Sequence, residues 1–322
     1  MSLPLLSTRV PRRQLVRVAG AAALAAVALA GCSTTPAATG AAATSSPGGS
    51  PVITVVAAEN FWGSLAEQLG GTHVKVTSII NNPDADPHDY EPTAADGREI
   101  AAAQLAIVNG VGYDGWATSL ADANPSDTRT TLTVGDLVGA KDGGNPHRWY
   151  NPANVKQVMA QITADYQKAD PADAAYFATQ HNTVLNTNLK QYFSLISQIK
   201  ARYAGTPVGA SESIFAMLSP ALGLNLLTPP AFLRAISEGT DPSAADKATV
   251  DQQIKTKQIQ VYVYNSQNAT PDIQAQVNAA KAQGIPVTTI TETLTPAGAS
   301  FQDWQVAQLT ALKNALAQAT GK

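Results

Sequence analysis

Two histidines lie in loops whose residues suit metal binding. His88 lies in the segment NNPDADPHDYEP, and His147 lies in NPHRWYNP. Each directly follows a proline, which restricts the local backbone and therefore favours a preorganised imidazole. Because histidine is the commonest metal-ligating side chain, the pair predicts a metal site, although two loop histidines with structural roles would show the same pattern. The other two are His73, in a Gly-Gly-Thr-His turn, and His181, among polar residues of an expected helix, and we expect both at the surface.

Two other motifs point to chemistry that the rest of the chain does not support. The segment GVGYDG at 110–115 fits the dinucleotide fingerprint, but it lies outside the first strand–helix–strand unit and is followed by Trp116 and polar residues. The segment GASES at 209–213 resembles a nucleophile elbow without its second glycine, and no histidine follows His181. Neither a nucleotide cofactor nor a serine hydrolase is therefore expected.

The histidine loops belong to an alternating pattern of strands and helices. Short apolar runs at 52–58, 74–80 and 105–109 predict buried parallel strands, and helices are expected at 61–69 and 94–104. Such alternation is typical of a parallel sheet covered by helices. The first histidine loop directly follows a strand, which is where sheets of this class bind ligands.

A long helix is expected in the middle of the chain, at 171–203, where apolar residues recur with helical spacing and glycine is absent. The alternation then resumes, with strands expected at 208–211, 259–264 and 286–290 and a closing helix at 304–319. The sequence thus predicts an α/β fold with two Rossmann-like lobes, each holding a parallel sheet, joined by one long backbone helix.

The first fifty residues read as an export signal and a tether. Four arginines precede an apolar run at 20–30 that is too short to span a membrane and ends in Leu-Ala-Gly-Cys at Cys32. This matches a bacterial lipoprotein cleavage box. A plain signal peptide with an unrelated thiol, or a twin-arginine signal, are the alternatives. Residues 33–50 contain only small and polar residues and proline, so we expect a flexible tether.

Composition narrows the class of protein further. The 322 residues carry a net charge of −3, so the chain lacks the excess of basic residues that is typical of nucleic-acid-binding proteins. Hydrophobic residues make up 44% of the chain, which is ample for a folded core. The single cysteine excludes a disulfide framework within the chain. The predicted segments are a signal peptide at 1–31, a lipid-anchored tether at 32–50, an N-terminal lobe at 51–168, a linking helix at 169–204 and a C-terminal lobe at 205–322.

These segments together resemble the metal-binding lipoprotein receptors of bacterial ABC importers for zinc and manganese, the ZnuA/TroA-like group. ADPHDYEPT at 85–93 is similar to that family's G-x-D-P-H-x-Y-E-P-T signature, and NPHRW at 145–149 is similar to its D-P-H-x-W segment. The resemblance runs from about residue 52 to 316. It implies a metal bound by four side chains in the cleft between two lobes.

The resemblance also implies which residues bind the metal. Position by position, it assigns His88 and His147 in the N-terminal lobe, Glu212 after the first strand of the C-terminal lobe, and Glu292 after the last strand. The family usually has aspartate at the fourth position, so Asp241 and Asn265 are alternatives. Glu59 ends the first strand, where it contributes to the site or caps the following helix.

The ligand set implied by the resemblance is two imidazoles and two carboxylates, which neutralise a dication and accept zinc or manganese, with iron a lesser option. Family members for manganese resemble this chain in having glutamate at the third position. We therefore expect a binding protein, not an enzyme, that is monomeric, anchored outside the membrane through Cys32, and delivers metal to an ABC permease. A tethered metallohydrolase, and an adhesin or receptor for an organic ligand, are the alternatives.

Overall fold

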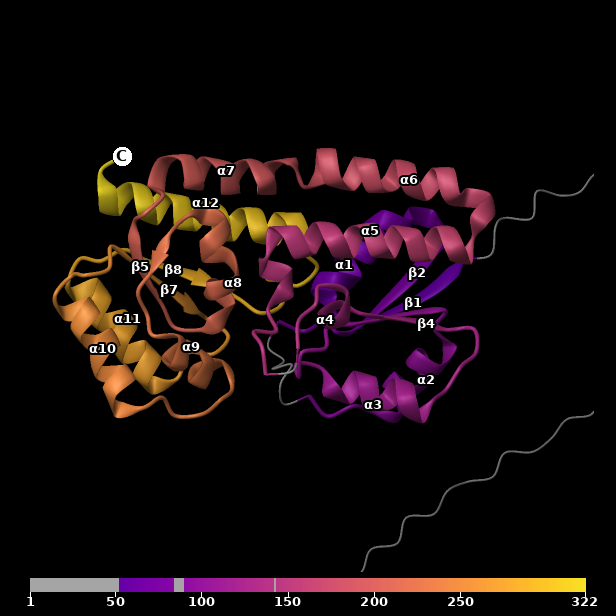
Figure 1. The fold of residues 1–322 in the computed structure, drawn as a ribbon, viewed down its shortest axis with the longest axis horizontal. Helices are drawn as coiled ribbons and strands as arrows, with labels where there is room; N and C mark the ends of the chain where they lie inside the picture. The colour runs from indigo at the N-terminus through magenta and orange to yellow at the C-terminus, as the bar shows by residue number, and fades with distance from the viewer. Residues whose placement is uncertain (1–51, 84–89, 142) are drawn as a thin grey trace, which may run out of the picture. The chain divides into compact units, whose positions relative to one another are not determined.

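The computed structural model describes three stretches of the chain, residues 52–83, 90–141 and 143–322 (Figure 1). The predicted signal peptide at 1–31, the tether at 32–50 and the anchor residue Cys32 lie outside the described residues, and so does His88. Among the helices that are described, none is long and apolar enough to cross a membrane.

The N-terminal lobe is built on a parallel four-stranded sheet with strand order β2-β1-β3-β4. Its strands are β1 (Ile53–Glu59), β2 (Val74–Ile80), β3 (Leu105–Val108) and β4 (Thr130–Thr133). Its helices are α1 (Asn60–Gly70), α2 (Ala94–Ala102), α3 (Gly115–Ala123), α4 (Val134–Leu137) and α5 (Pro152–Ala169). Both faces of β1 are buried, because Val55 packs in the core beside α1 and α5 whereas Val56 packs against α2 and α3.

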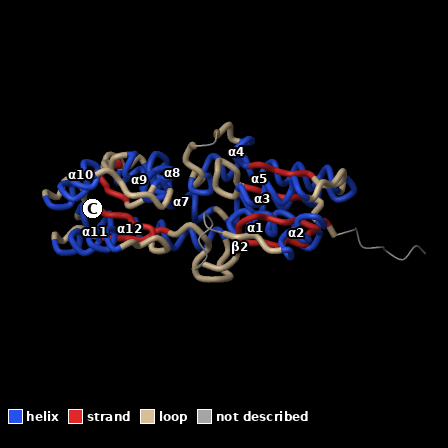
Figure 2. Tube along the Cα trace, turned by 90° about the horizontal axis from the view of Figure 1, so that it is seen from below, coloured by secondary structure: helices blue, strands red, loops and turns tan. Residues whose placement is uncertain are grey.

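The C-terminal lobe repeats this arrangement with the parallel order β6-β5-β7-β8. Its strands are β5 (Pro207–Ala210), β6 (Asn225–Leu226), β7 (Val261–Asn265) and β8 (Val287–Ile290). Its helices are α8 (Ser213–Leu222), α9 (Pro230–Ser237), α10 (Ala244–Lys255), α11 (Pro271–Ala282) and α12 (Phe301–Thr320). Figure 2 shows strands between helices in both lobes, which confirms the predicted fold class of two helix-covered parallel sheets.

A nearly continuous helical segment links the lobes, as predicted (Figure 1). It begins with a 3-10 turn, η3 (Pro171–Asp173), and continues through α6 (Ala174–Thr183), the π-helical turn η4 (Val184–Asn188) and α7 (Lys190–Tyr203). α7 packs along α12, and α6 packs along α5, so the segment is held by both lobes. The π turn makes this a helix in two parts, because a π turn interrupts the regular i to i−4 hydrogen bonds.

One hydrophobic core cluster runs through both lobes, and the C-terminal lobe has a second cluster of its own between its sheet and α9, α10 and α11. The rings of Phe61 and Trp149 stack with centroids 3.8 Å apart, and Tyr150 lies edge-on to Trp304 with centroids 5.6 Å apart. The hydroxyl of Tyr150 also donates to the backbone carbonyl of Thr291 over 2.7 Å. This packing joins the loop after His147 to the segment that carries Glu292.

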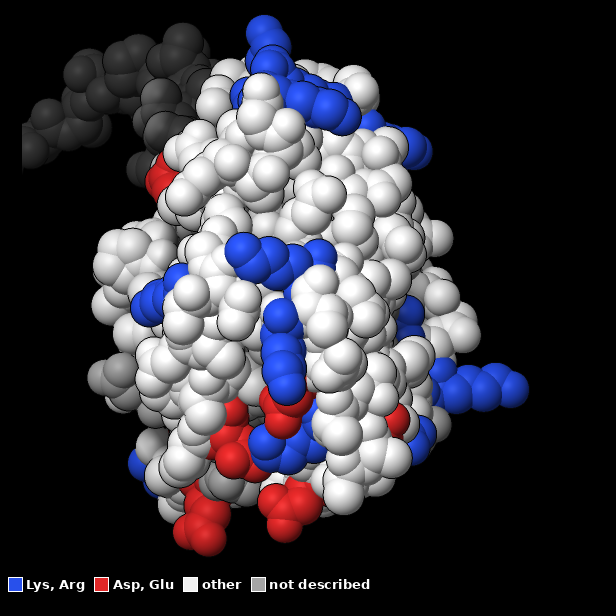
Figure 3. Space-filling model, turned by 90° about the vertical axis from the view of Figure 1, so that its left-hand side faces the viewer, with Lys and Arg blue, Asp and Glu red and all other residues white. Residues whose placement is uncertain are grey.

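The end of the C-terminal lobe carries charges of both signs (Figure 3). In this view lysine and arginine side chains are spread over the face, and the aspartate and glutamate side chains gather toward its lower edge. On α10 an i, i+4 pair joins Lys247 to Asp251 over 3.1 Å. Exposed pairs of this kind add little stability.

Candidate metal centre

The predicted ligands and their alternatives lie mostly at the carboxyl ends of strands. Glu59 is the last residue of β1 and Asn265 the last residue of β7, while Glu212 and Glu292 closely follow the ends of β5 and β8. His147 immediately precedes the 3-10 turn η2 (Arg148–Tyr150). Parallel sheets present their ligand-binding residues at this edge, so the topology brings residues of both lobes to one region.

His147 is fully buried, and its imidazole orientation is set by Asn145. The Oδ1 atom of Asn145 lies 3.1 Å from the backbone nitrogen of His147 and 2.8 Å from its Nδ1. Because Oδ1 already accepts the backbone N–H, it acts as an acceptor toward the ring as well. Nδ1 therefore carries the proton in the neutral ring, and the lone pair is on Nε2, which is the atom that a metal would bind.

The same asparagine connects the histidine loop to the C-terminal lobe. Nδ2 of Asn145 donates to the carbonyl oxygen of Ser213 over 2.6 Å. The hydroxyl of Ser213 lies 3.2 Å from Nδ1 of His147 and 2.8 Å from the hydroxyl of Ser237. Because Nδ1 donates its proton to Asn145, it is not a base for Ser213.

Glu212 and Glu292 are brought together by a single amide. Nδ2 of Asn265 lies 2.9 Å from Oε2 of Glu212 and 3.2 Å from Oε1 of Glu292. The amide orientation follows from its other end, where Oδ1 accepts the backbone N–H of Gln267 over 2.9 Å. All three side chains are buried, with exposures of 0% for Asn265, 1% for Glu212 and 5% for Glu292. Two buried carboxylates that share one amide donor are costly to keep charged, and a bound cation would offset that cost.

The loop after β7 supports both carboxylates. Nδ2 of Asn268 donates to Oε1 of Glu212 over 2.6 Å, and Oε1 of Gln267 accepts the backbone N–H of Glu292 over 2.7 Å. Nε2 of Gln267 also donates to the carbonyl oxygen of Pro83, the last described residue before the segment 84–89. Gln267 thus connects the Glu292 loop to the strand–loop region in which His88 was predicted to act.

A tight turn in the N-terminal lobe places Tyr113 against Glu292. Val111 has a φ of 60° and Gly110 a φ of 69°, the left-handed region that a β-branched residue rarely adopts. The carboxylate of Asp114 accepts the backbone N–H groups of Asn109 and Gly110 over 2.6 and 2.7 Å. The segment that fits the dinucleotide fingerprint is therefore a structural turn that presents the Tyr113 ring.

Glu59 is fully buried beside Asp114 rather than acting as a helix cap. Glu59 is at the N-cap position, directly before α1, but its side chain makes no capping hydrogen bond. Burial raises the pKa of Glu59 well above its ordinary value, and the neighbouring charge of Asp114 raises it further. Burial raises the pKa of Asp114 too, although the backbone N–H donors partly offset this. The pKa of Glu59 is therefore the more strongly raised of the two, because no backbone donor stabilises its charge to the same extent.

The remaining predicted residues have different positions. Asp241 is exposed in the connection between α9 and α10. Sequence reasoning missed the polar residues that orient the carboxylates and the imidazole. These are Tyr113, Asn145, Gln267 and Asn268. Asn145 is adjacent to the Pro-His pair and could have been found from that spacing, whereas the other three carry no local signal.

The described donors fit a divalent metal cargo. One imidazole and two carboxylates supply nitrogen and oxygen ligands, with two negative charges to match a dication. Each has neighbouring groups that fix its orientation, which is the usual design of a metal site. The chemistry of the donor set is therefore compatible with either zinc or manganese.

The fold and this polar cluster define a class of protein, a two-lobed α/β binding protein with its candidate site where the strands of both lobes end. The chain belongs to the ZnuA family, the zinc-uptake complex component A, periplasmic, whose model matches residues 55–315.

Curated relatives include lipoproteins named for metal binding. The manganese-binding lipoprotein MntA of Halalkalibacterium halodurans is 26% identical over 177 residues, which cover 49% of this chain and 58% of that relative. The metal ABC transporter substrate-binding lipoprotein FimA of Streptococcus parasanguinis is 27% identical over 267 residues, which cover 76% of this chain and 81% of FimA. The chain therefore matches 58% of MntA's length but 81% of FimA's.

Solved structures share the fold at low sequence identity. The manganese-bound periplasmic metal-binding protein from Candidatus Liberibacter asiaticus is 18% identical, with a TM-score of 0.69. The match covers 82% of this chain and 99% of that protein's chain. A mutant of the laminin-binding adhesin Lmb from Streptococcus agalactiae, also 18% identical, has a TM-score of 0.68 with the same coverage. At this identity the likeness establishes the fold alone.

Proposed function

We propose that this protein is an extracytoplasmic substrate-binding protein that captures a divalent metal ion, zinc or manganese, and delivers it to an ABC permease. The observation that carries the proposal is the shared amide of Asn265, which holds Glu212 and Glu292 together in a buried site. The ZnuA-family model and the metal-binding names of the relatives support the same cargo. No bond-making chemistry is assigned to the site.

The proposed ligands are Nε2 of His147, the carboxylates of Glu212 and Glu292, and His88, which the sequence motif assigns. Either ion fits this nitrogen and oxygen set, and affinity alone favours zinc over manganese. Asn265 cannot supply negative charge, so we place it as the residue that orients the carboxylates, and the exposed Asp241 is left out of the site.

The membrane anchor and the oligomeric state are part of the same proposal. Cleavage before Cys32 and lipidation of its thiol would hold the folded body outside the membrane on the tether at 32–50. We propose that the body acts as a monomer, because the two lobes of one chain together supply the residues of the candidate site. Intact-mass spectrometry of the membrane-extracted protein tests the anchor, and light scattering of the purified protein tests the monomer.

Calorimetric titration of the purified protein with manganese and zinc tests the cargo. Glu212→Gln and His147→Ala should each weaken binding of either ion by more than tenfold. Asp241→Asn is the matched control, because it removes an exposed carboxylate from the same lobe, and it should bind like wild type. Binding of neither ion by the wild-type protein, or equal losses in all three variants, would refute the proposed site.

A further inference from the structure

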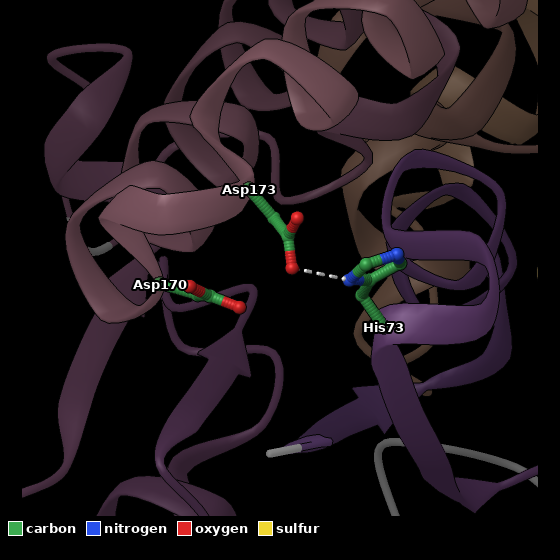
Figure 4. A group of neighbouring side chains, drawn as sticks. All are labelled: His73, Asp170 and Asp173. Carbon is green, nitrogen blue, oxygen red and sulfur yellow. Dashed lines mark ion pairs between the residues drawn. The ribbon is translucent and has the colours of Figure 1, made fainter. Parts of the chain in front are cut away.

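A second cluster of metal-ligating side chains lies where two turns of the N-terminal lobe meet. His73 ends the 3-10 turn η1 (Gly71–His73) between α1 and β2, and Asp170 and Asp173 flank the turn between α5 and α6. In Figure 4 the three side chains point toward a common space from these two turns. The two turns are about a hundred residues apart in sequence, so only the fold brings them together.

The distances within this cluster suit a bound cation. Nδ1 of His73 lies 2.9 Å from Oδ2 of Asp173, and one ligand atom from each of the three residues lies within 4.8 Å of the others. A cation bound at about 2.1 Å keeps its ligand atoms roughly 3 to 3.5 Å apart. Small side-chain rotations therefore suffice to close the cluster around an ion.

Asp170 provides the second, independent observation. It is 8% exposed, and its Oδ1 accepts the backbone N–H of Ala172 over 3.2 Å. Its Oδ2 is buried and has no hydrogen-bond partner among the described residues, while the carboxylate faces the other two side chains in Figure 4. A buried carboxylate oxygen without a donor is costly, and a cation is one of the few groups that would satisfy it.

The imidazole of His73 is held in place by aromatic packing. Its ring lies 4.1 Å from the Tyr176 ring and 5.8 Å from the Phe177 ring between centroids. The hydroxyl of Tyr176 also accepts the backbone N–H of Thr72 over 3.4 Å. His73 is thus half-buried against α6 and is not the simple surface residue that its Gly-Gly-Thr-His turn predicted. A ligand whose orientation is fixed by packing loses little entropy on binding.

This cluster is separate from the site between the lobes. His73 immediately precedes Val74, the first residue of β2, whereas the proposed cargo ligands follow the carboxyl ends of strands. β2 contains seven residues, and a strand of that length spans about 20 Å. One ion cannot therefore bridge the two places.

We propose that His73, Asp170 and Asp173 form a second divalent-cation site, which fastens the α1–β2 turn to the start of the linking helix. One imidazole and two carboxylates suit zinc or manganese, with water in the remaining positions. An ion there would be structural rather than cargo. The proposal does not depend on the function assigned to the other site.

Equilibrium dialysis of the full chain against zinc chloride and manganese chloride, with bound metal measured by mass spectrometry, tests the proposal. Asp170→Asn keeps the capping oxygen but removes the charge, and His73→Gln removes the imidazole. Wild type should bind two ions per chain, and each of these variants should bind one. Glu212→Gln combined with Glu292→Gln should also leave one ion, bound at the second site.

His181→Gln is the matched control, because His181 is a half-buried histidine in the same region whose Nδ1 bonds to Thr163 over 3.0 Å. It should retain both ions. Circular dichroism of each variant checks folding, and either Asp170→Asn or His73→Gln alone suffices for the test. Wild type with one ion per chain, lost in the Glu212 and Glu292 double variant, overturns the second site but leaves the cargo site standing. Two ions retained in Asp170→Asn and His73→Gln also overturn it.

Discussion

The hydroxyl of Tyr113 donates a 3.0 Å hydrogen bond to Oε2 of Glu292, across 179 residues of sequence and from one lobe to the other. The same carboxylate receives the amide of Asn265 at its other oxygen. Donors from both lobes thus fix the Glu292 carboxylate. Removing the Tyr113 hydroxyl would therefore change the orientation of Glu292, a proposed ligand, without changing its charge.

Replacing Tyr113 by phenylalanine should weaken manganese and zinc binding by about 10–100-fold, because a hydrogen bond to a charged group contributes about 1.5–3 kcal/mol. The ring packing against Phe61 and Trp149 is kept, so the midpoint of thermal unfolding should change little. Calorimetric titration and thermal denaturation check the two expectations. Unchanged affinity would show that this hydroxyl does not orient the ligand.

Asn265→Asp should destabilise the metal-free protein by about 3 kcal/mol or more, because it replaces a shared donor with a third buried carboxylate. Saturation with manganese should then stabilise the variant more than it stabilises wild type, since a dication relieves the repulsion. Urea unfolding with and without metal measures both effects. Asn268→Asp is a useful comparison, because Asn268 donates to Glu212 but is not shared with Glu292. A metal-free Asn265→Asp protein as stable as wild type would contradict the bridging role.

Asn145→Ala should lower metal affinity by about 10–100-fold, the usual cost of losing a group that orients a ligating histidine. Asn145→Asp should lose less, because a carboxylate still accepts the proton of His147 Nδ1, although it cannot donate to Ser213. Titrations of the two variants side by side separate the two contacts. Equal losses would mean that the Ser213 contact, not the tautomer of His147, controls affinity.

The buried Glu59 predicts a specific pH dependence of stability. Its pKa is raised in the folded protein, so the folded state keeps a proton that the unfolded state releases above about pH 4.3. The free energy of unfolding should therefore fall as pH rises from there through the folded pKa. Glu59→Gln should reduce this slope and stabilise the protein at neutral pH.

Urea unfolding across this pH range measures the Glu59 effect. Glu67→Gln, on the solvent side of α1, is the control and should leave the slope as in wild type. A Glu59→Gln slope that matches wild type would mean that Glu59 is charged in the folded protein.

Most strands could be predicted from the sequence, because a strand that is buried on both faces has a continuous run of apolar residues. β2 has the predicted bounds, and β1 differs from its prediction by one residue at each end. Apolar runs such as the one at 105–109 are continuous because helices cover both sides of the sheet. The two strands that the sequence did not reveal, β4 with the composition TTLT and the two-residue β6, bury too few apolar side chains to leave this pattern.

The sequence by itself thus determined the two lobes, the linking helix and the family, because apolar periodicity and the Pro-His segments are local features. Only the tertiary structure decided which polar groups meet, because Tyr113, Asn265 and the carboxylates they orient come from distant strand ends. The same holds for His73 and Asp173, which only the packing of α1 against α5 and α6 brings together. Hydrogen bonds and ligand distances depend on positions in space, and a linear pattern does not encode those positions.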